Sequence, residues 1–238
     1  MHLPNIRKVF IPDEGMEFFD IDLDSADLRV VAWESGCEQV KKWFAEGKKP
    51  YVELMKEYFH DQSITKKHPK YGMFKSLCHG SNYLGIAKNL APRLGLLVHE
   101  TEKLQNWYFG ACPEIPKWQK QLISQVDRTK TVSNVWGYKF TFYDRITSHT
   151  YNAAVAWIPQ STVGILINHA YVNIDKNLPE VEVLLQVHDS LAGQFPIVNR
   201  ETHISNILRE AAVPLPYRDP LIIPVGIKTS PVSWGECE

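Results

Sequence analysis

Short apolar runs, separated by long blocks with helical periodicity, set the pattern of this chain. Residues 16–22 read as a buried strand, residues 181–187 and 191–195 as two strands joined by a tight turn, and residues 221–228 as a last strand. Residues 131–143 have the pattern of a hairpin with its turn near Trp136-Gly137. Strands in separate patches, with helical blocks between them, predict an α+β fold.

Helices are predicted for most of the remaining chain, with their ends at caps, glycines and prolines. The predicted helices cover about 24–33, 37–60 with a break at Gly47 and Pro50, 71–84, a short helix to about 90, two helices within 100–126 split at Cys112-Pro113, 148–174 with a bend near Pro159, and 200–212.

Two aspartates end apolar strands, and they are the first candidates for chemistry. Asp22 ends the strand at 16–22, and Asp189 follows the strand at 181–187. A carboxylate beside a buried strand requires a compensating cation or donor. Two such carboxylates on adjacent strands form a possible site for a pair of magnesium ions in phosphoryl transfer. Each segment taken alone is equally well explained as a strand end that caps the following residues.

Composition narrows the class without deciding the function. The chain has 238 residues, of which 44% are apolar and 22% charged, as in an ordinary soluble protein. Its four cysteines form no CxxC pair, and no secretion signal or membrane-length apolar run is present, so we expect a reducing, cytoplasmic setting without a membrane partner. Neither a GxxxxGK[ST] loop nor a GxGxxG turn after a strand occurs.

The net charge of −1 conceals an uneven distribution. Acidic residues predominate in residues 1–36, and basic residues predominate in residues 41–93. An acidic metal-binding segment beside a basic phosphate-binding one suits a nucleotide enzyme. A solvated basic helix surface is the commoner explanation of such a run.

Three segments carry motifs: residues 22–30 (DLDSADLRV), residues 75–83 (KSLCHGSNY) and residues 184–189 (LLQVHD). In this order they resemble the first palm motif DYSQIELRV, the fingers motif KxxxFGxxYG and the last palm motif LLQVHDE of family A DNA polymerases, the bacterial polymerase I and bacteriophage type. Residues 5–15, 158–162 and 225–227 are similar to further parts of the same region.

The resemblance implies a polymerase palm, an antiparallel sheet with packed helices, plus helical fingers, with the thumb absent. It assigns residues 1–36 and 127–238 to the palm and residues 37–126 to the fingers, with the main fingers helix at 70–84. The implied activity is template-directed DNA synthesis from dNTPs on primer-template DNA. Asp22 and Asp189 are then the catalytic carboxylates that hold two Mg²⁺ ions, for which Mn²⁺ can substitute, with the backbone carbonyl of Leu23 as a further ligand.

The fingers residues follow the family pattern only in part. The resemblance makes Lys75 the triphosphate contact and Tyr83 a ring near the templating base. Four further positions differ in residue type from the family: Asp27 matches the ribose-gating Glu, His79 an aromatic residue, Tyr51 a histidine, and Lys70 is the nearest replacement for an arginine.

Two further residues are expected to contact DNA. Gln160 and His188 resemble the minor-groove readers near the primer terminus. Minor-groove acceptors are largely shared by the base pairs, so such contacts test pair shape rather than sequence.

Three functional hypotheses remain open from the sequence. The first is the palm and fingers of a split or truncated polymerase, with a second polypeptide that carries the thumb and exonuclease. The second is a catalytically impaired, polymerase-like subunit that binds nucleic acid. The third is a metal phosphohydrolase that uses His188 and Asp189, but the other histidines lack the spacing of additional ligands.

Overall fold

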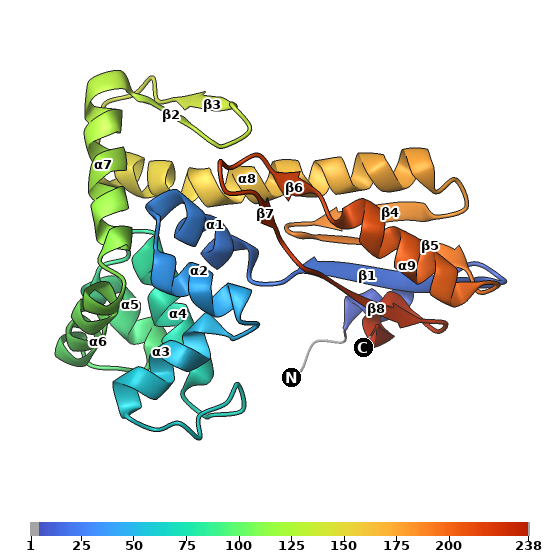
Figure 1. Ribbon diagram of the computed structural model, residues 1–238, viewed down its shortest axis with the longest axis horizontal. Coiled ribbons are helices and arrows are strands. Elements are labelled where there is room, and N and C mark those ends of the chain that lie inside the picture. The colour runs from blue at the N-terminus through green and yellow to red at the C-terminus, as the bar shows by residue number, and fades with distance from the viewer. Residues whose placement is uncertain (1–4, 238) are drawn as a thin grey trace. The chain divides into compact units, whose positions relative to one another are not determined.

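The computed structural model describes residues 5–237, which form two compact units (Figure 1). One unit, here called the sheet unit, contains the chain up to Ala26 and from Ser161 onward. The other, called the helical unit, spans Asp27–Gln160. These limits differ from residues 36 and 126, and the division into palm and fingers stays a prediction.

A four-stranded antiparallel sheet forms the centre of the sheet unit. Its strands are β1 (Met16–Leu23), β4 (Glu182–Val187), β5 (Ser190–Pro196) and β8 (Val225–Ser230), in the order β4-β5-β1-β8. The strands predicted at 16–22, 181–187 and 191–195 are therefore confirmed. β1 is central, and its burial reflects this position, since Phe18, Phe19 and Ile21 are at most 1% exposed.

The two faces of this sheet have different partners, because side chains alternate along each strand. On one face Phe19 meets Phe195, whose ring contacts His203 of α9 (Arg200–Ala211). On the other face Phe18 stacks on Trp234 of the short helix η2 (Trp234–Glu236), and η1 (Ile6–Val9) packs beside it. Asp20 and Asp22 share the Phe18 face, and the Trp234 indole donates a hydrogen bond to Asp20 there.

The end of the chain differs from the single strand predicted at 221–228. The structure contains β7 (Leu221–Ile222), which pairs with β6 (Pro214–Leu215), and then β8, which pairs with β1. Pro224 lies between β7 and β8, and its ring removes the backbone N–H that a continuous ladder requires. Its carbonyl instead accepts a hydrogen bond from the Asp24 N–H at the end of β1.

Helices build most of the other unit, as predicted. They are α1 (Ala26–Ser35), α2 (Glu38–Ala45), α3 (Pro50–Phe59), α4 (Tyr71–Asn82), α5 (Ala87–Leu94), α6 (Val98–Ala111), α7 (Glu114–Thr129) and the first part of α8 (Ser148–Asn177). Gly47 and Pro50 separate α2 from α3, and Pro113 separates α6 from α7. The helix expected to end near residue 90 continues to Leu94, where Gly95 adopts the left-handed conformation typical of a helix end.

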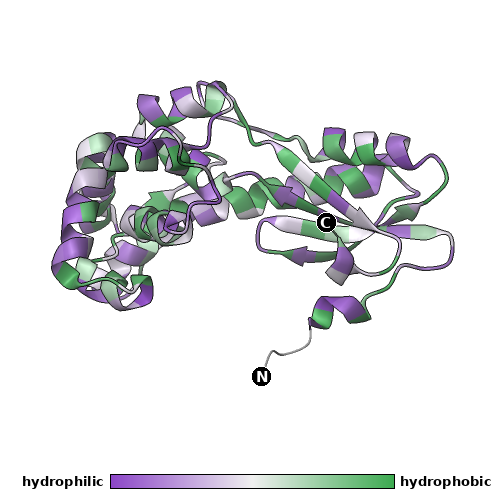
Figure 2. Ribbon diagram, turned by 90° about the horizontal axis from the view of Figure 1, so that it is seen from below, coloured by the Kyte–Doolittle hydropathy of each residue, from purple (hydrophilic) through white to green (hydrophobic). Residues whose placement is uncertain are grey.

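One apolar core holds the helical unit together. Phe74 and Leu77 of α4, Tyr108 of α6 and Ile115 of α7 have no exposed surface. In Figure 2 the helices carry green segments beside purple ones, as expected for elements with one buried face. The predicted hairpin is confirmed as β2 (Thr131–Ser133) and β3 (Lys139–Thr141). An antiparallel sheet in one unit and a largely helical second unit make the fold α+β, as predicted.

Candidate active site

Asp22 and Asp189 line the same cavity of the sheet unit, about 440 Å³ in volume. Asp22 is the seventh residue of β1, and its register partner on β5 is Ser190, the residue after Asp189. The prediction that two distant segments bring these carboxylates to one place therefore agrees with this geometry. His188 lines the cavity as well.

Small neighbours keep the Asp22 carboxylate accessible. Asp22 faces Ser190 of β5 on one side and Gly226 of β8 on the other. A Cβ atom at Gly226 would lie 3.8 Å from the Asp22 carbonyl oxygen, an ordinary van der Waals distance, so the backbone is not crowded at this position. Asp22 is exposed although both residues that flank it, Ile21 and Leu23, are buried.

The second carboxylate is placed by a two-residue hairpin turn. Val187 pairs with Ser190, which leaves His188 and Asp189 as the turn residues. His188 has a φ of +55°, in the left-handed region that hairpins of this length use at their first turn position. The Ser190 hydroxyl donates a hydrogen bond to the Val187 carbonyl at 2.9 Å and closes the turn.

The cavity has an excess of negative charge around Asp22. Partial burial raises the pKa of Asp22, and the carboxylates of Asp189 and Asp20 raise it further, whereas Lys228 acts in the opposite direction. Asp20 is held by the Trp234 indole, whose Nε1–H donates to its Oδ2 at 2.7 Å. A cation bound between the carboxylates would relieve this repulsion.

The donor set fits hard divalent cations but does not complete a site by itself. Mg²⁺ prefers oxygen ligands and commonly binds through one or two carboxylates, waters and substrate phosphates. Within residues 5–237, no group of three or more His, Cys, Asp or Glu side chains is arranged to hold a metal ion. Two carboxylates in one open cavity are compatible with ions that the substrate helps to bind. Leu23, the predicted carbonyl ligand, is the last residue of β1 and directly follows Asp22.

Lys75 and His79 lie on α4 with their side chains exposed. They are four residues apart, so they share one face of the helix. Tyr83 is the C-cap of α4, and its ring meets the His79 ring edge-on with centroids 4.8 Å apart. Three of the predicted fingers residues, Lys75, His79 and Tyr83, therefore form a continuous strip along α4.

Asp27, at the beginning of α1, joins this strip. Its Oδ2 lies 3.9 Å from Nδ1 of His79. Burial raises the pKa of Tyr83, and the nearby charge of Asp27 raises it further. The Tyr83 hydroxyl itself is buried. Asp27, His79 and Tyr83 are thus neighbours, as a common role in sugar or base recognition requires.

Tyr51 and Lys70 are placed differently from the other predicted contacts. Tyr51 of α3 is 5% exposed and belongs to the apolar core, where burial raises its pKa well above the usual value. Lys70 precedes α4, and its Nζ lies 5.3 Å from the centroid of the Phe59 ring. Lys70 is exposed to solvent, whereas Tyr51 is available to a ligand only if its surroundings rearrange.

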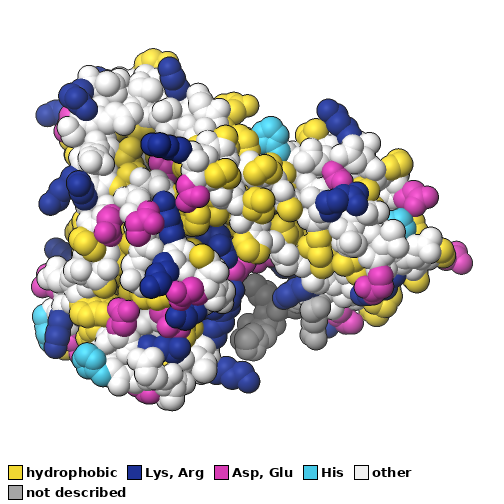
Figure 3. Space-filling view, viewed as in Figure 1, with side chains coloured by type: hydrophobic (Ala, Val, Ile, Leu, Met, Phe, Trp, Pro, Cys, Tyr) yellow, Lys and Arg dark blue, Asp and Glu magenta, His cyan; other side chains and the backbone are white. Residues whose placement is uncertain are grey.

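Gln160, the other predicted DNA contact, has an exposed side chain on α8. Arg29 of α1 is 8% exposed, and its guanidinium lies 3.9 Å from the centroid of the Phe44 ring. Figure 3 shows lysines and arginines spread over the helical unit with acidic residues among them, so on this face the basic run at 41–93 forms no single-sign patch.

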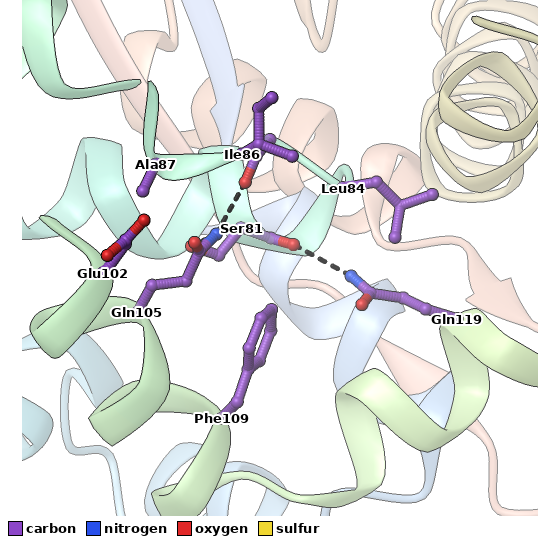
Figure 4. Close-up of a pocket in the computed structure, with 9 residues that line it drawn as sticks. Ser81, Leu84, Ile86, Ala87, Glu102, Gln105, Phe109 and Gln119 are labelled. Carbon is purple, nitrogen blue, oxygen red and sulfur yellow. Dashed lines mark hydrogen bonds between the residues drawn. The ribbon is translucent and has the colours of Figure 1, made fainter. Parts of the chain in front are cut away.

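A second cavity of about 360 Å³ lies within the helical unit at the C-terminal end of α4 (Figure 4). Two glutamines reach across it to backbone groups there. Gln105 of α6 donates to the Gly85 carbonyl at 2.6 Å, and Gln119 of α7 donates to the carbonyls of Ser81 and Asn82 at 2.9 Å. The carbonyls of Ser81 and Asn82 belong to the last turn of α4, where carbonyls lack α-helical partners, and the Gly85 carbonyl lies in the segment that follows. The side chains therefore brace the end of α4.

Three charged residues that line the cavity of Asp22 and Asp189 were not singled out from the sequence: Arg7, Asp20 and Lys228. Side chains alternate along β1, which places Asp20 on the same face as Asp22, so this alternation in the sequence is sufficient to identify Asp20 as a neighbour of the site. Lys228 lies opposite Asp20 in the register of β1 and β8, and Arg7 lies 3.7 Å from the Asp20 carboxylate. The position of Lys228 cannot be deduced without the strand register, and that of Arg7 cannot be deduced without the packing of η1 against η2.

Comparison with known proteins identifies the family. Residues 2–229 match the model of DNA polymerase family A. The chain is 24% identical to the DNA polymerase of Mycobacterium phage D29, over 97% of this chain and 37% of that protein, and 26% identical to the thermostable DNA polymerase I of Thermus filiformis, over 93% of this chain and 28% of that protein.

A similar fold occurs in the POL domain of Pol1 from M. smegmatis, solved in complex with a DNA primer-template and dNTP. The TM-score is 0.86 at 20% identity, with 98% of this chain and 42% of that chain covered. The chain thus spans about a third of the length of the curated relatives named above. Among the helices of residues 5–237, none combines the length and apolar character needed to cross a membrane. Because the family model covers nearly the whole sequence, this chain belongs to DNA polymerase family A.

Proposed function

We propose that this chain catalyses template-directed DNA synthesis, in which the 3′-hydroxyl of a primer attacks the α-phosphate of a dNTP and pyrophosphate leaves. The single observation that carries the proposal is the common cavity of Asp22 and Asp189. Membership of the family supports the type of reaction, and the pair of carboxylates supports this cavity as the place where the reaction would occur.

Asp22 and Asp189 would bind two divalent cations, Mg²⁺ or Mn²⁺, together with the backbone carbonyl of Leu23. When bound, such ions stabilise the attacking oxygen and the charge that develops on the leaving pyrophosphate. The chain itself supplies ionised carboxylates in a fixed relative position, one from a central strand and one from a tight hairpin turn. Fixed positions lower the reorganisation needed at the moment of reaction.

Substrate contacts are proposed for the strip along α4. Lys75 would bind the triphosphate through its exposed ammonium group. Asp27, His79 and Tyr83, which are neighbours, would contact the sugar and the templating base. Lys70 is a further cation for the triphosphate, and Tyr51 contributes only if the core around it opens. Gln160 and His188 would read the minor groove near the primer terminus.

A catalytically impaired subunit that binds nucleic acid is the second candidate. The burial of Tyr51 favours it, because one predicted triphosphate contact is then missing. The retention of both carboxylates in an open cavity opposes it, because a binding subunit has no use for a repulsive acidic pair. The metal phosphohydrolase lacks support within residues 5–237, since no three ligating side chains converge there.

Primer extension with Mg²⁺ tests the proposal. We expect incorporation by the parent chain, its loss in Asp22→Ala and Asp189→Ala, and nearly unchanged binding of primer-template DNA in both variants. Asp175→Ala is a matched control, since Asp175 is an exposed acidic residue on α8. Full activity in either cavity variant would refute the assignment of the carboxylates.

The assay also separates the two candidates and addresses the predicted second polypeptide. It is run with the chain alone and with the product of the gene immediately upstream. Incorporation only in the mixture supports a partner that carries the thumb. DNA binding without incorporation in either condition supports the impaired subunit.

A further inference from the structure

The β2–β3 hairpin of the helical unit presents an exposed group of aromatic side chains. Tyr138 is 60% exposed, Phe140 44% and Tyr143 89%. Aromatic residues stand at positions 138, 140 and 142, so the alternation along β3 places these three rings on one side of the hairpin, whereas Trp136 belongs to the turn and Tyr143 follows the strand. Figure 1 shows the hairpin extending from the end of α7.

This aromatic row is anchored at one end and open at the other. Phe140 contacts Phe142 with centroids 4.9 Å apart and Trp157 of α8 with centroids 5.9 Å apart. Val132, which pairs with Phe140 across the hairpin, is fully buried. The row therefore begins at the core and continues outward to Tyr138 near the turn.

The hairpin backbone is fixed by its own hydrogen bonds. Asn134, which is 6% exposed, accepts from the backbone N–H groups of Trp136 and Tyr138 at 3.1 Å through its side chain. The ladder continues beyond the strands, from Asn134 N–H to the Tyr138 carbonyl and from Phe142 N–H to the Lys130 carbonyl. Exposed rings on a fixed backbone lose little conformational entropy when they bind a partner.

Charged residues around the row are mainly basic. Residues 128–145 contain four basic side chains and one acidic side chain. The basic side chains Arg128, Lys130, Lys139 and Arg145 and the acidic Asp144 are all exposed. Asp127, just before this segment, is engaged by the Tyr151 hydroxyl at 2.6 Å. Aromatic rings with cations beside them are complementary to a polymer of bases and phosphates.

We propose that this hairpin binds unpaired nucleotides of DNA. Tyr138 and Phe140 of the row stack on bases, and Tyr143, the most exposed aromatic residue of the segment, adds a further ring beyond the end of β3. Lys139 with its basic neighbours holds the phosphates. Stacking suits single strands, because bases in a duplex already stack on one another and leave no face free. The proposal takes from the proposed function only that DNA is the partner of this chain, and it concerns a surface separate from the carboxylate cavity.

Binding to single-stranded and duplex DNA tests this inference. The full chain is titrated against fluorescein-labelled oligo(dT) and against a blunt duplex of equal length, in EDTA so that no catalysis occurs. In the double variant Tyr138→Ala/Tyr143→Ala we expect the Kd for oligo(dT) to rise about fivefold or more. The Kd for the blunt duplex should stay nearly constant. Tyr171→Ala, at an exposed tyrosine of α8, is the matched control.

Salt dependence separates stacking from charge. The association constant K for oligo(dT) falls as the salt concentration rises. In Lys139→Gln the slope of log K against log salt should be less steep by about 0.7, the value for one phosphate contact on a single strand. The tyrosine variant should keep the slope of the parent, and Lys117→Gln, at an exposed lysine of α7, should leave it unchanged.

Three results would overturn the proposal: an unchanged Kd for oligo(dT) in the tyrosine variant, equal losses for oligo(dT) and duplex, or loss of self-association in light scattering in place of lost DNA binding. The last result would identify the hairpin as a protein interface. Because the assay contains no metal, its outcome does not depend on whether the chain polymerises nucleotides.

Discussion

Asp22 and Asp189 share one cavity, and the charge of Asp189 acts on Asp22. Partial burial is the main cause that raises the pKa of Asp22, and Asp189 provides the largest electrostatic contribution. An acidic pair of this kind costs free energy while it is empty, because burial and repulsion both oppose its ionised form. A site that binds cations accepts this cost for its function.

We predict that Asp22→Asn melts at a higher temperature than the parent at pH 7 in EDTA. A pKa that is raised in the folded state means that the folded chain binds the proton more tightly than the unfolded chain. The stability that protonation provides is present below the unfolded pKa near 4 and is lost as the pH rises through the folded pKa. The melting temperatures of parent and variant should therefore converge as the pH falls toward 4.

Circular dichroism melting curves between pH 4 and pH 7 measure this effect, with Asp175→Asn as the control. Added Mg²⁺ should then stabilise the parent more than Asp22→Asn, since the variant lacks one ligand. A lower melting temperature for Asp22→Asn at pH 7 in EDTA would contradict the electrostatic argument.

Lys75→Ala should raise the KM for dNTP by about tenfold or more, the effect expected for one charge-assisted contact. Its ammonium group is exposed on α4 and holds no structural position that the substitution would damage. Steady-state kinetics over a range of dNTP concentrations measures the change. Lys88→Ala, an exposed lysine of α5, is the control. An unchanged KM in Lys75→Ala would remove this residue from the triphosphate site.

Asp27 should influence the choice between deoxyribose and ribose. It lies beside His79 and Tyr83, and it is one methylene shorter than the glutamate of the family pattern. Asp27→Ala should lower the ratio of kcat/KM for dNTP over the ribonucleotide, and Asp27→Glu should raise it. Single-nucleotide incorporation with both substrates measures the ratio. Equal ratios in the parent and both variants would show that the sugar is read elsewhere.

The sequence predicts well where local pattern determines structure. The apolar run of residues 16–22 and the strand that ends before His188 required no tertiary information, and both strands exist. The same holds for the helix breaks at Gly47 and Pro50, because these residues constrain the backbone themselves.

What the sequence could not provide is the pairing of distant segments. The register that places Lys228 opposite Asp20, and Gly226 opposite Asp22, depends on the packing of β8 against β1. The burial of Tyr51 likewise results from the surrounding helices, since a tyrosine on an amphipathic helix fits either face. The interruption between β7 and β8 is different, because Pro224 is a local signal in the sequence for a break in the strand.

Two glycines provide a matched pair for testing the sheet that carries the site. At Gly193 of β5, an added Cβ would clash with the Glu182 carbonyl oxygen and lie 2.8 Å from the Phe19 ring. Relief of this clash requires that β4 or β5 move, so Gly193→Ala should cost about 3 kcal/mol of unfolding free energy. At Gly164 of α8 no atom lies within 4 Å of the added Cβ, and Gly164→Ala should stabilise the chain by up to about 1 kcal/mol. Urea unfolding measures both changes. Equal effects of the two substitutions would show that the close packing of β4, β5 and β1 at Gly193 does not limit stability.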